Sequence, residues 1–355
     1  MPLDPVLTSF LDQLYAQPGP KMWEFSPAEA RQAFVLLMQF VGPKNVPVGK
    51  VEDLHAQGPH GKVPLRSYTP PGAGEAPLPT LVFFHGGGFV IGDLDTHDGL
   101  CRVLAKESGA RVIAVDYRLA PNHKFPAAVD DAWAALCWIT ANAKRLGVDS
   151  RRLAVGGDSA GAALATVSAN IAKDKGGPDL ALQLLMFPPT DLAAETPSRR
   201  KWTEGCFLDK LTIEWFFDNY LPKNAELRDP RLSPLHAGDL RGVAPVYLLT
   251  AGCDPLHDEA IAYAGKLKQA GVAVTIADYP HLVHDFIYLD AVLPQAREAL
   301  TAAAAAVRDA FNARQPLSAA CTSNTLPGLR MLCGSSARFS SRIKPISFSD
   351  RDSGR

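Results

Sequence analysis

The sequence has little of several features that would indicate other classes of protein. Its 36 basic and 37 acidic residues leave a formal net charge of -1, so there is no excess of one sign to attract nucleic acid or an anionic membrane. No apolar run approaches the roughly 18 residues that a membrane span needs. We therefore expect neither a nucleic-acid partner nor a membrane partner.

Cysteines are few and scattered. None forms a C-x-x-C pair or a zinc-finger spacing, so the sequence predicts free thiols and neither a disulfide framework nor a structural metal. The six cysteines are Cys101, Cys137, Cys206, Cys253, Cys321 and Cys333. The first 20 residues also lack a cationic segment followed by an apolar one, so we expect no secretion signal and a cytoplasmic location.

Short, continuous apolar runs alternate with longer helical patterns along most of the chain. Such runs are typical of strands that are covered on both faces, and the segments between them are long enough for helices. The pattern predicts an α/β protein with a mostly parallel central sheet flanked by helices. The predicted strands are 81–84, 111–115, 152–157, 181–187, 245–251 and 273–279. The predicted helices include 93–109, 127–146, 159–174 and an alanine-rich helix near 294–313.

Two segments interrupt this alternation. Residues 1–45 show amphipathic helical patterns, and residues 192–235 form a polar insert that contains LTIEWFFDNYL. We expect both to fold over the sheet as a helical cap, which leaves 46–191 and 236–314 as the core.

The aromatic residues of the insert have two interpretations. Trp215 and Phe216 either pack as in any amphipathic helix or form the wall of a ligand pocket, and we take them as the candidate substrate-binding residues of that wall. From residue 315 the composition becomes serine-rich, without a sustained period or large apolar clusters, so it cannot offset the entropy of ordering. We expect 315–355 to be a disordered tail. A functional basic tail is disfavoured because its charges are dispersed.

The strongest local motif is GDSAG at 157–161, between a predicted strand and a predicted helix. A nucleophilic serine on a sharp strand-to-helix turn needs small neighbours, because the backbone is strained and its flanks pack closely. The motif alone occurs by chance, but its strand–turn–helix context makes Ser159 the predicted nucleophile.

Three glycines follow the predicted strand 81–84, in the sequence HGGGF. Glycines let backbone N–H groups face a ligand, which suits stabilisation of an oxyanion. We assign the donors as Gly87, Gly88 and Ala160, and we expect His85 to hold the glycine turn. A phosphate-binding loop is the alternative, but the sequence has neither G-x-G-x-x-G opening a helix nor Gly-Lys-Ser/Thr here.

A serine hydroxyl needs a base within hydrogen-bond reach, and the base needs an orienting acid. In this architecture the chain order is Ser, then Asp or Glu, then His. Asp254 follows the predicted strand 245–251, while Asp191 follows the preceding predicted strand. We favour Asp254, because a tighter link to its strand holds the carboxylate more firmly.

The base is sought beyond the last predicted strand, where His281 and His284 lie. Their spacing could suggest a metal, but no acidic or cysteine partner at ligand spacing completes such a site. We choose His284, because it lies farther into the loop and is followed by Phe286, which can wedge the loop against the core. His281 is expected to be a loop residue.

Five blocks resemble, in matching order, the signatures of the bacterial hormone-sensitive-lipase-like esterases. They are HGGGFVIGD (85–93), DYRLAP (116–121), GDSAG (157–161), DPLHDE (254–259) and HDF (284–286). The resemblance spans residues from about 1 to 313. It implies an α/β-hydrolase fold with a cap, the triad Ser159, Asp254 and His284, and the oxyanion donors assigned above.

The resemblance also implies hydrolysis of small-molecule esters with short to medium acyl chains, by chemistry that needs no metal or organic cofactor. The chain departs from the usual pattern at three positions. Asn122 stands where Glu is usual, Ala162 stands where a further Gly often follows GDSAG, and Asp285 stands where a Gly often separates His from Phe. A binding protein with a hydrolase shell, and a hydrolase of amides, lactones or carbamates, stay open, because fold does not decide function. A homodimer is a possible assembly.

Overall fold

The computed structural model describes residues 2–16 and 19–315. An eight-stranded sheet has the order β1-β2-β4-β3-β5-β6-β7-β8. β1 and β2 form an antiparallel hairpin, β2 pairs antiparallel with β4, and every other neighbouring pair is parallel. The strands are β1 (Lys50–Gly58), β2 (Gly61–Thr69), β3 (Leu78–Phe84), β4 (Arg111–Val115), β5 (Val148–Asp158), β6 (Leu180–Met186), β7 (Val246–Cys253) and β8 (Val274–Val283).

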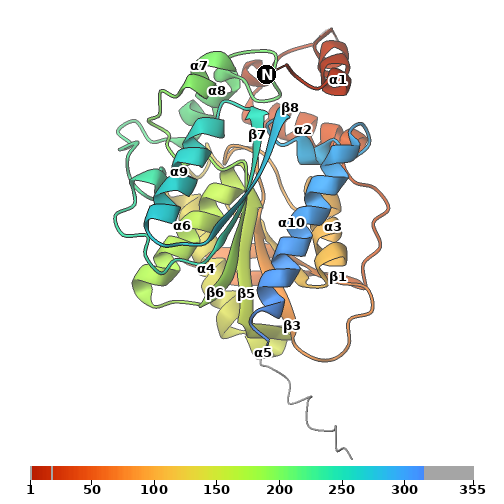
Figure 1. Cartoon of the computed structure of the whole chain (residues 1–355), viewed down its shortest axis with the longest axis vertical. Coiled ribbons are helices and arrows are strands. Elements are labelled where there is room, and N and C mark those ends of the chain that lie inside the picture. Colours follow the sequence, from red (N-terminus) through yellow and green to blue (C-terminus); the bar gives the residue numbers. More distant parts are fainter. Residues whose placement is uncertain (1, 17–18, 316–355) are drawn as a thin grey trace, which may run out of the picture. The chain divides into compact units, whose positions relative to one another are not determined.

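Helices cover both faces of this sheet. α3 (Asp98–Ser108) and α10 (Pro294–Asn312) pack against each other on one face (Figure 1). α4 (Ala127–Ala141), α6 (Ala160–Lys175) and α9 (His257–Gln269) lie on the other, and the short α5 (Ala143–Leu146) follows α4. Because both faces are covered, β6 is buried along its whole length, as its continuous apolar run predicts.

The predicted mostly parallel sheet is confirmed, and each predicted strand corresponds to one of β3 to β8. The hairpin of β1 and β2 was not predicted. β1 has the sequence KVEDLHAQG and lies at the edge of the sheet, where most of its side chains are exposed or half-buried. A search for continuous apolar runs finds central strands and overlooks an edge strand of this kind.

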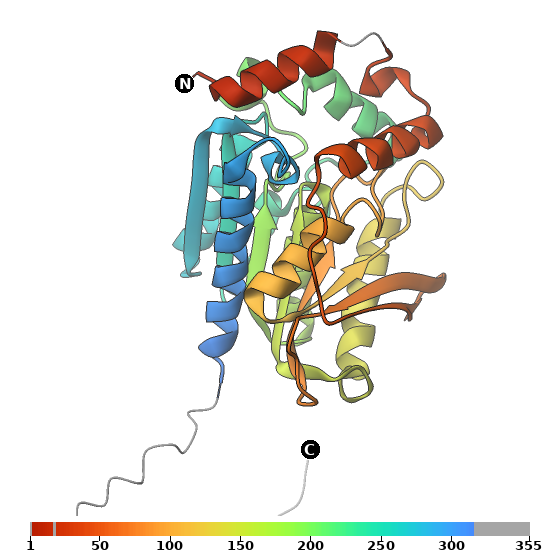
Figure 2. The same cartoon turned by 90° about the vertical axis from the view of Figure 1, so that its right-hand side faces the viewer.

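Three helices lie beyond the carboxyl ends of the parallel strands: α1 (Pro5–Ala16), α2 (Pro27–Val41) and α8 (Lys210–Tyr220) (Figure 2). α2 begins with a capping box, in which Ser26 and Glu29 each bind the other's backbone N–H, and α8 begins with the side chain of Asp209 accepting from Thr212 N. The hydroxyl of Tyr15 donates to the carbonyl of Cys206 at 2.9 Å, which joins α1 to the segment before α8. The remaining short helices are η1 (Met22–Glu24), α7 (Pro197–Lys201), η2 (Pro234–His236) and η3 (Phe286–Tyr288).

The cysteines within the described residues, Cys101, Cys137, Cys206 and Cys253, are free thiols, as predicted. No helix among residues 2–16 and 19–315 is both long and apolar enough to cross a membrane. The tail predicted at 315–355 lies, apart from Gln315, outside the described residues.

Candidate active site

Ser159 occupies the sharp turn between β5 and α6. Its backbone has φ 48° and ψ −121°, a conformation that residues with a side chain rarely adopt. The turn is held by a bond from Ser159 N to the carbonyl of Met186 at 2.8 Å. It also packs so closely on β3 that a Cβ at Gly161 would lie 1.9 Å from the carbonyl oxygen of Phe84. This approach explains why the motif needs glycine there.

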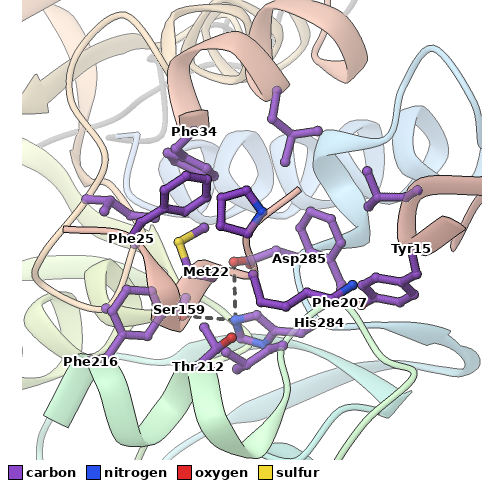
Figure 3. A pocket seen from close by; sticks show the side chains of 18 of the residues that line it. Tyr15, Met22, Phe25, Phe34, Ser159, Phe207, Thr212, Phe216, His284 and Asp285 are labelled. Carbon is purple, nitrogen blue, oxygen red and sulfur yellow. Dashed lines mark hydrogen bonds and ion pairs between the residues drawn. The ribbon is translucent and has the colours of Figure 1, made fainter. Parts of the chain in front are cut away.

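His284 follows β8 and faces Ser159. Its Nε2 lies 2.9 Å from Ser159 Oγ, and its Nδ1 lies 2.7 Å from Oδ2 of Asp254, which follows β7 (Figure 3 shows the contact with Ser159). The other oxygen of Asp254 accepts from Leu256 N at 2.8 Å, which fixes the carboxylate. Ser159, His284 and Asp254 are all buried. Their arrangement is that of a nucleophile, a base and an orienting acid.

The two rival residues lie elsewhere. Oδ1 of Asp191 is 3.0 Å from Nε2 of His236, and Nδ1 of His281 is 2.8 Å from the carbonyl of Pro2 on the surface. Within the described part of the chain neither bonds to Ser159 or His284. The structure therefore brings together the acid and the base that the sequence analysis favoured.

The glycine loop after β3 approaches Ser159. Gly87 has φ 108° and Gly88 has φ 58°, and a Cβ at Gly88 would lie 2.2 Å from the ring of Phe216. Among the described residues, the N–H groups of Gly87, Gly88 and Ala160 donate to no acceptor. Three such N–H groups around a serine could bind an oxyanion.

His85 holds this loop, as the sequence predicts. Its Nδ1 lies 2.8 Å from the carbonyl of Gly86, and its ring stacks on Tyr117 with centroids 4.2 Å apart. Burial lowers the pKa of His85 to about 4, which keeps the ring neutral.

A second buried network joins the glycine loop to the serine turn, and the sequence analysis missed it. Asp158, next to Ser159, accepts a hydrogen bond from the hydroxyl of Tyr288. Nε2 of His97 lies 3.4 Å from the same carboxylate oxygen and accepts from Gly86 N at 3.1 Å. Only the position of Asp158 within GDSAG signals this network in the sequence, because its partners are far away along the chain.

A largely apolar pocket of about 400 Å³ opens at Ser159 (Figure 3). Its lining includes side chains of α1, η1, α2 and α8 and of the link between η1 and α2, among them Tyr15, Met22, Phe25, Phe34, Thr212 and Phe216. A smaller space of about 40 Å³ reaches Ser159 on the side of Ala160. Phe216 lines both spaces. Trp215 is not among the described residues that line either one, and its ring packs on Phe216 with centroids 5.3 Å apart.

Asp285 is a further site residue that sequence reasoning did not assign. Its Oδ2 lies 3.2 Å from Nε2 of His284, the nitrogen that faces Ser159 (Figure 3). Its backbone has φ 51°, a region that favours glycine, and Gly is the residue often found there in the resembled family. That departure was the only signal in the sequence.

The carboxylates shape the electrostatics of the imidazole. Burial opposes a charge on His284, but Asp254 and Asp285 outweigh it and raise the pKa of the imidazole well above its usual range. Burial raises the pKa of Asp285 to about 6, against the opposite effect of His284. In residues 2–16 and 19–315 there is no group of three or more His, Cys, Asp or Glu side chains that could hold a metal ion.

Comparisons with known proteins identify the family. Residues 81–288 match the model of a protein family whose description is 'alpha/beta hydrolase fold'. Ethyl acetate hydrolase of Pseudomonas putida is 40% identical over 313 residues, which are 84% of this chain and 96% of that protein. This chain belongs to the hormone-sensitive-lipase-like branch of the α/β hydrolases. The resemblance found in the sequence is thereby confirmed.

A further relative and two solved structures are also similar to this chain. The carboxylic ester hydrolase LipN of Mycobacterium tuberculosis is 46% identical over 245 residues, which are 67% of this chain and 65% of LipN. An α/β-hydrolase enzyme from the metagenome of Lake Arreo, Spain, superposes with a TM-score of 0.85 at 41% identity, over 87% of this chain and 99% of that chain. A hyperthermophilic esterase of the archaeon Pyrobaculum calidifontis has a TM-score of 0.82 at 39% identity, over 89% of this chain and 100% of that chain.

Proposed function

We propose that the protein is a serine carboxylesterase that hydrolyses small-molecule esters through an acyl-enzyme intermediate. The observation that carries this proposal is the alignment of Ser159 Oγ, His284 and Asp254, at 2.9 and 2.7 Å, at the base of an apolar pocket. The names of the relatives, several of them esterases or ester hydrolases, support the same class of reaction.

The reaction begins with proton transfer. Nε2 of His284 takes the hydroxyl proton while Ser159 Oγ bonds to the ester carbonyl carbon, which turns the carbonyl oxygen into an oxyanion. The N–H groups of Gly87, Gly88 and Ala160 stabilise that oxyanion. Collapse breaks the bond to the alcohol oxygen, which leaves with the proton from His284.

Water completes the cycle. It attacks the acyl-enzyme as Nε2 of His284 takes one of its protons, and the second collapse releases the carboxylic acid and returns the proton to Ser159 Oγ. Throughout, Asp254 accepts from Nδ1–H of His284, which keeps Nε2 free to act as base and stabilises the imidazolium while it exists. No metal or organic cofactor takes part in these steps.

The pocket suggests the substrate class. The space of about 40 Å³ is about a tenth of the larger one, so we assign the smaller group of the ester to it. The other group must lie in the larger space of about 400 Å³. We therefore propose acyl esters of short to medium length, with residues 1–45 and 192–235 acting as the two parts of a cap over the core formed by 46–191 and 236–314.

A paired test separates an esterase from the alternatives. Purified protein is assayed with p-nitrophenyl butanoate and with the corresponding p-nitroanilide, and a fluorophosphonate is used to label the active serine before mass spectrometry. We expect fast ester hydrolysis, at least 100-fold slower amide hydrolysis and a single phosphonyl adduct on the peptide that contains Ser159. Labelling without turnover of either substrate would indicate another bond type, and the absence of labelling would contradict a serine hydrolase.

A cytoplasmic location and a homodimer stay predictions. Cell fractionation checks the first, and size-exclusion chromatography with light scattering checks the second.

A further inference from the structure

The catalytic imidazole has a carboxylate on each side. Asp254 lies at Nδ1, as an orienting acid does, but Asp285 Oδ2 also lies 3.2 Å from Nε2. We propose that Asp285 is a positioning residue that binds a proton together with Nε2 of His284, so that the base becomes free only at a higher pH than Asp254 alone would set. This inference rests on the proposed function, because it concerns the base of that reaction.

The contact between Asp285 and His284 is favourable only if a proton lies between the two side chains. When Nδ1–H donates to Asp254, Nε2 carries a lone pair, and that lone pair must accept from Ser159 for the reaction to begin. An ionised Asp285 facing the same lone pair is repelled by it. One added proton between Nε2 and Asp285 Oδ2 turns the repulsion into a hydrogen bond, whichever of the two atoms carries the proton.

The surroundings of Asp285 favour keeping this proton. The residue is buried, and among the described residues its Oδ1 has no hydrogen-bond partner, so an ionised carboxylate is poorly solvated there. Two other acidic groups, Asp158 at the end of β5 and Asp254, act on Asp285 through their charge. Both add negative potential, which disfavours ionisation of Asp285 further.

The remaining titratable groups near Asp285 come from several elements. The charge of Asp285 helps to raise the pKa of Tyr288 on η3. Tyr15 on α1 and Lys21 before η1 line the larger pocket together with Asp285. Lys21 Nζ lies over the ring of Tyr15, 5.0 Å from its centroid, and no ion pair joins it to Asp285 within the described residues. His284 is therefore the cation with which Asp285 shares its proton.

The backbone offers two variants that should fold. Asp285 has φ 51°, where Asn and Gly are the residues best tolerated. Asp285→Asn removes the charge at nearly constant shape, and Asp285→Gly removes the side chain altogether. Asp191→Asn is the matched control, because it removes a carboxylate that binds His236 and does not touch His284.

The pH profile of kcat/KM for p-nitrophenyl butanoate is measured for the wild type and the three variants. A base must be unprotonated, so activity falls as the pH drops through the pKa of His284 in the free enzyme. We expect the midpoint of this acid limb to move down by at least one pH unit in Asp285→Asn and Asp285→Gly, and to stay in place in Asp191→Asn. At pH 6, the fraction of its own high-pH kcat/KM that each Asp285 variant retains should then be about ten times the fraction that the wild type retains.

Histidine-labelled NMR spectra give a readout that needs no turnover. With the signals of His284 assigned by a His284→Asn variant, its imidazole should titrate above the ordinary value of about 6.5 in the wild type and lower in both Asp285 variants. A wild-type His284 that titrates at or below 6.5, or profiles whose midpoints do not move, would overturn the role of Asp285. If the proposed function is wrong, ester turnover will be absent, but the titration of His284 will still move to lower pH in the Asp285 variants.

Discussion

At the scale of single residues, the base of the site is fixed from both ends. Nδ1 of His284 is bound to Asp254, and Nε2 faces Ser159 at 2.9 Å, so the imidazole needs no rotation to take the proton. Ser159 in turn is aimed by a strained turn that is packed tightly against β3. Groups that act as one unit in this way show large and non-additive losses when any of them is removed.

The first prediction follows from the nucleophile. Ser159→Ala leaves no hydroxyl at the turn, so no acyl-enzyme can form, and kcat should fall by about 10⁶-fold. Steady-state kinetics with p-nitrophenyl butanoate measures the loss, and an unchanged melting temperature shows that the fold is intact. A variant that kept a tenth of the wild-type rate would move the nucleophile elsewhere.

The second prediction separates the two candidate acids. Asp254→Asn should lower kcat by about 10⁴-fold, because an amide can donate to Nδ1 and so leave the wrong tautomer at Nε2. Asp191→Asn should change kcat by less than about threefold, since its carboxylate binds His236 instead. The opposite order of the two losses would place the orienting acid after β6.

The sequence predicted the residues of this site that lie in local motifs. Ser159 could be found because its turn demands small neighbours within two residues, and Asp254 because it follows a buried strand. Asp285 and the network of His97 and Tyr288 could not be found in this way, because their roles depend on contacts across the fold with His284 and Asp158. Periodicity and local motifs contain no information on such distant pairs.

At the scale of elements, α7 is joined to α9 by a buried ion pair. Arg199 Nε and Glu259 Oε2 are 2.8 Å apart, and the other oxygen of Glu259 accepts from Thr190 N and Asp191 N in the segment that follows β6. Glu259 is fully buried, and burial raises its pKa to about 7 even with Arg199 beside it. This pair connects the segment after β6 to the helix that follows β7, and Arg199 also lines the smaller space beside Ser159.

The third prediction concerns the pH dependence of stability. The pKa of Glu259 in the folded protein lies above its ordinary value of 4.5, so the folded state holds the proton more tightly than the unfolded state does. The contribution of this proton to the free energy of unfolding is therefore complete below about pH 4.5 and is lost as the pH rises through about 7. Arg199→Leu removes the compensating charge. The free energy of unfolding should therefore fall by about 3–5 kcal/mol at pH 8, and by much less at pH 5, where Glu259 can stay protonated.

Urea unfolding of wild type and Arg199→Leu at both values of pH measures this difference. Arg241→Leu is the matched control, because it removes an exposed ion pair with Asp239 and should leave stability unchanged at either pH. An equal loss for Arg199→Leu at pH 5 and pH 8 would mean that the arginine acts through packing alone.

The element order shows why the fold was easier to predict than its edges. β3, β4, β6 and β7 carry apolar runs because helices cover both their faces, so the pattern along the chain reflects their surroundings. β1 and β2 lie at one edge, where fewer neighbours constrain their side chains. Apolar and polar residues alternate only weakly along β1. Such a hairpin becomes visible only once β2 is seen to pair with β4.

At the scale of the whole described chain, the pocket exists only because distant segments meet. Leu14 on α1, Phe34 on α2 and Phe216 on α8 line the same space as Ser159, although up to about 200 positions separate them in the sequence. Helical patterns predict each segment by itself, but not the shape that the segments enclose. The assignment of Trp215 to the pocket shows this limit, since its neighbour Phe216 on the same helix lines the space instead.

The last prediction concerns acyl chain length. Each methylene that enters an apolar pocket gains about 0.8 kcal/mol of burial, but only while space is left. In a pocket of about 400 Å³, kcat/KM for p-nitrophenyl esters should rise from acetyl to a maximum between butanoyl and octanoyl and fall steeply by palmitoyl, with no added rate on emulsified substrate.

Phe216 lines both the larger and the smaller space beside Ser159, so shortening it joins the two. Phe216→Ala should therefore move the maximum of the same ester series toward longer chains. Leu211→Ala is its matched control, since Leu211 lies on the same helix, is half-exposed and is not among the described residues lining either space. An unshifted maximum in Phe216→Ala would place the acyl chain outside the space that this ring bounds, and a wild type that prefers palmitoyl esters or emulsified triglyceride would contradict a pocket closed by the cap.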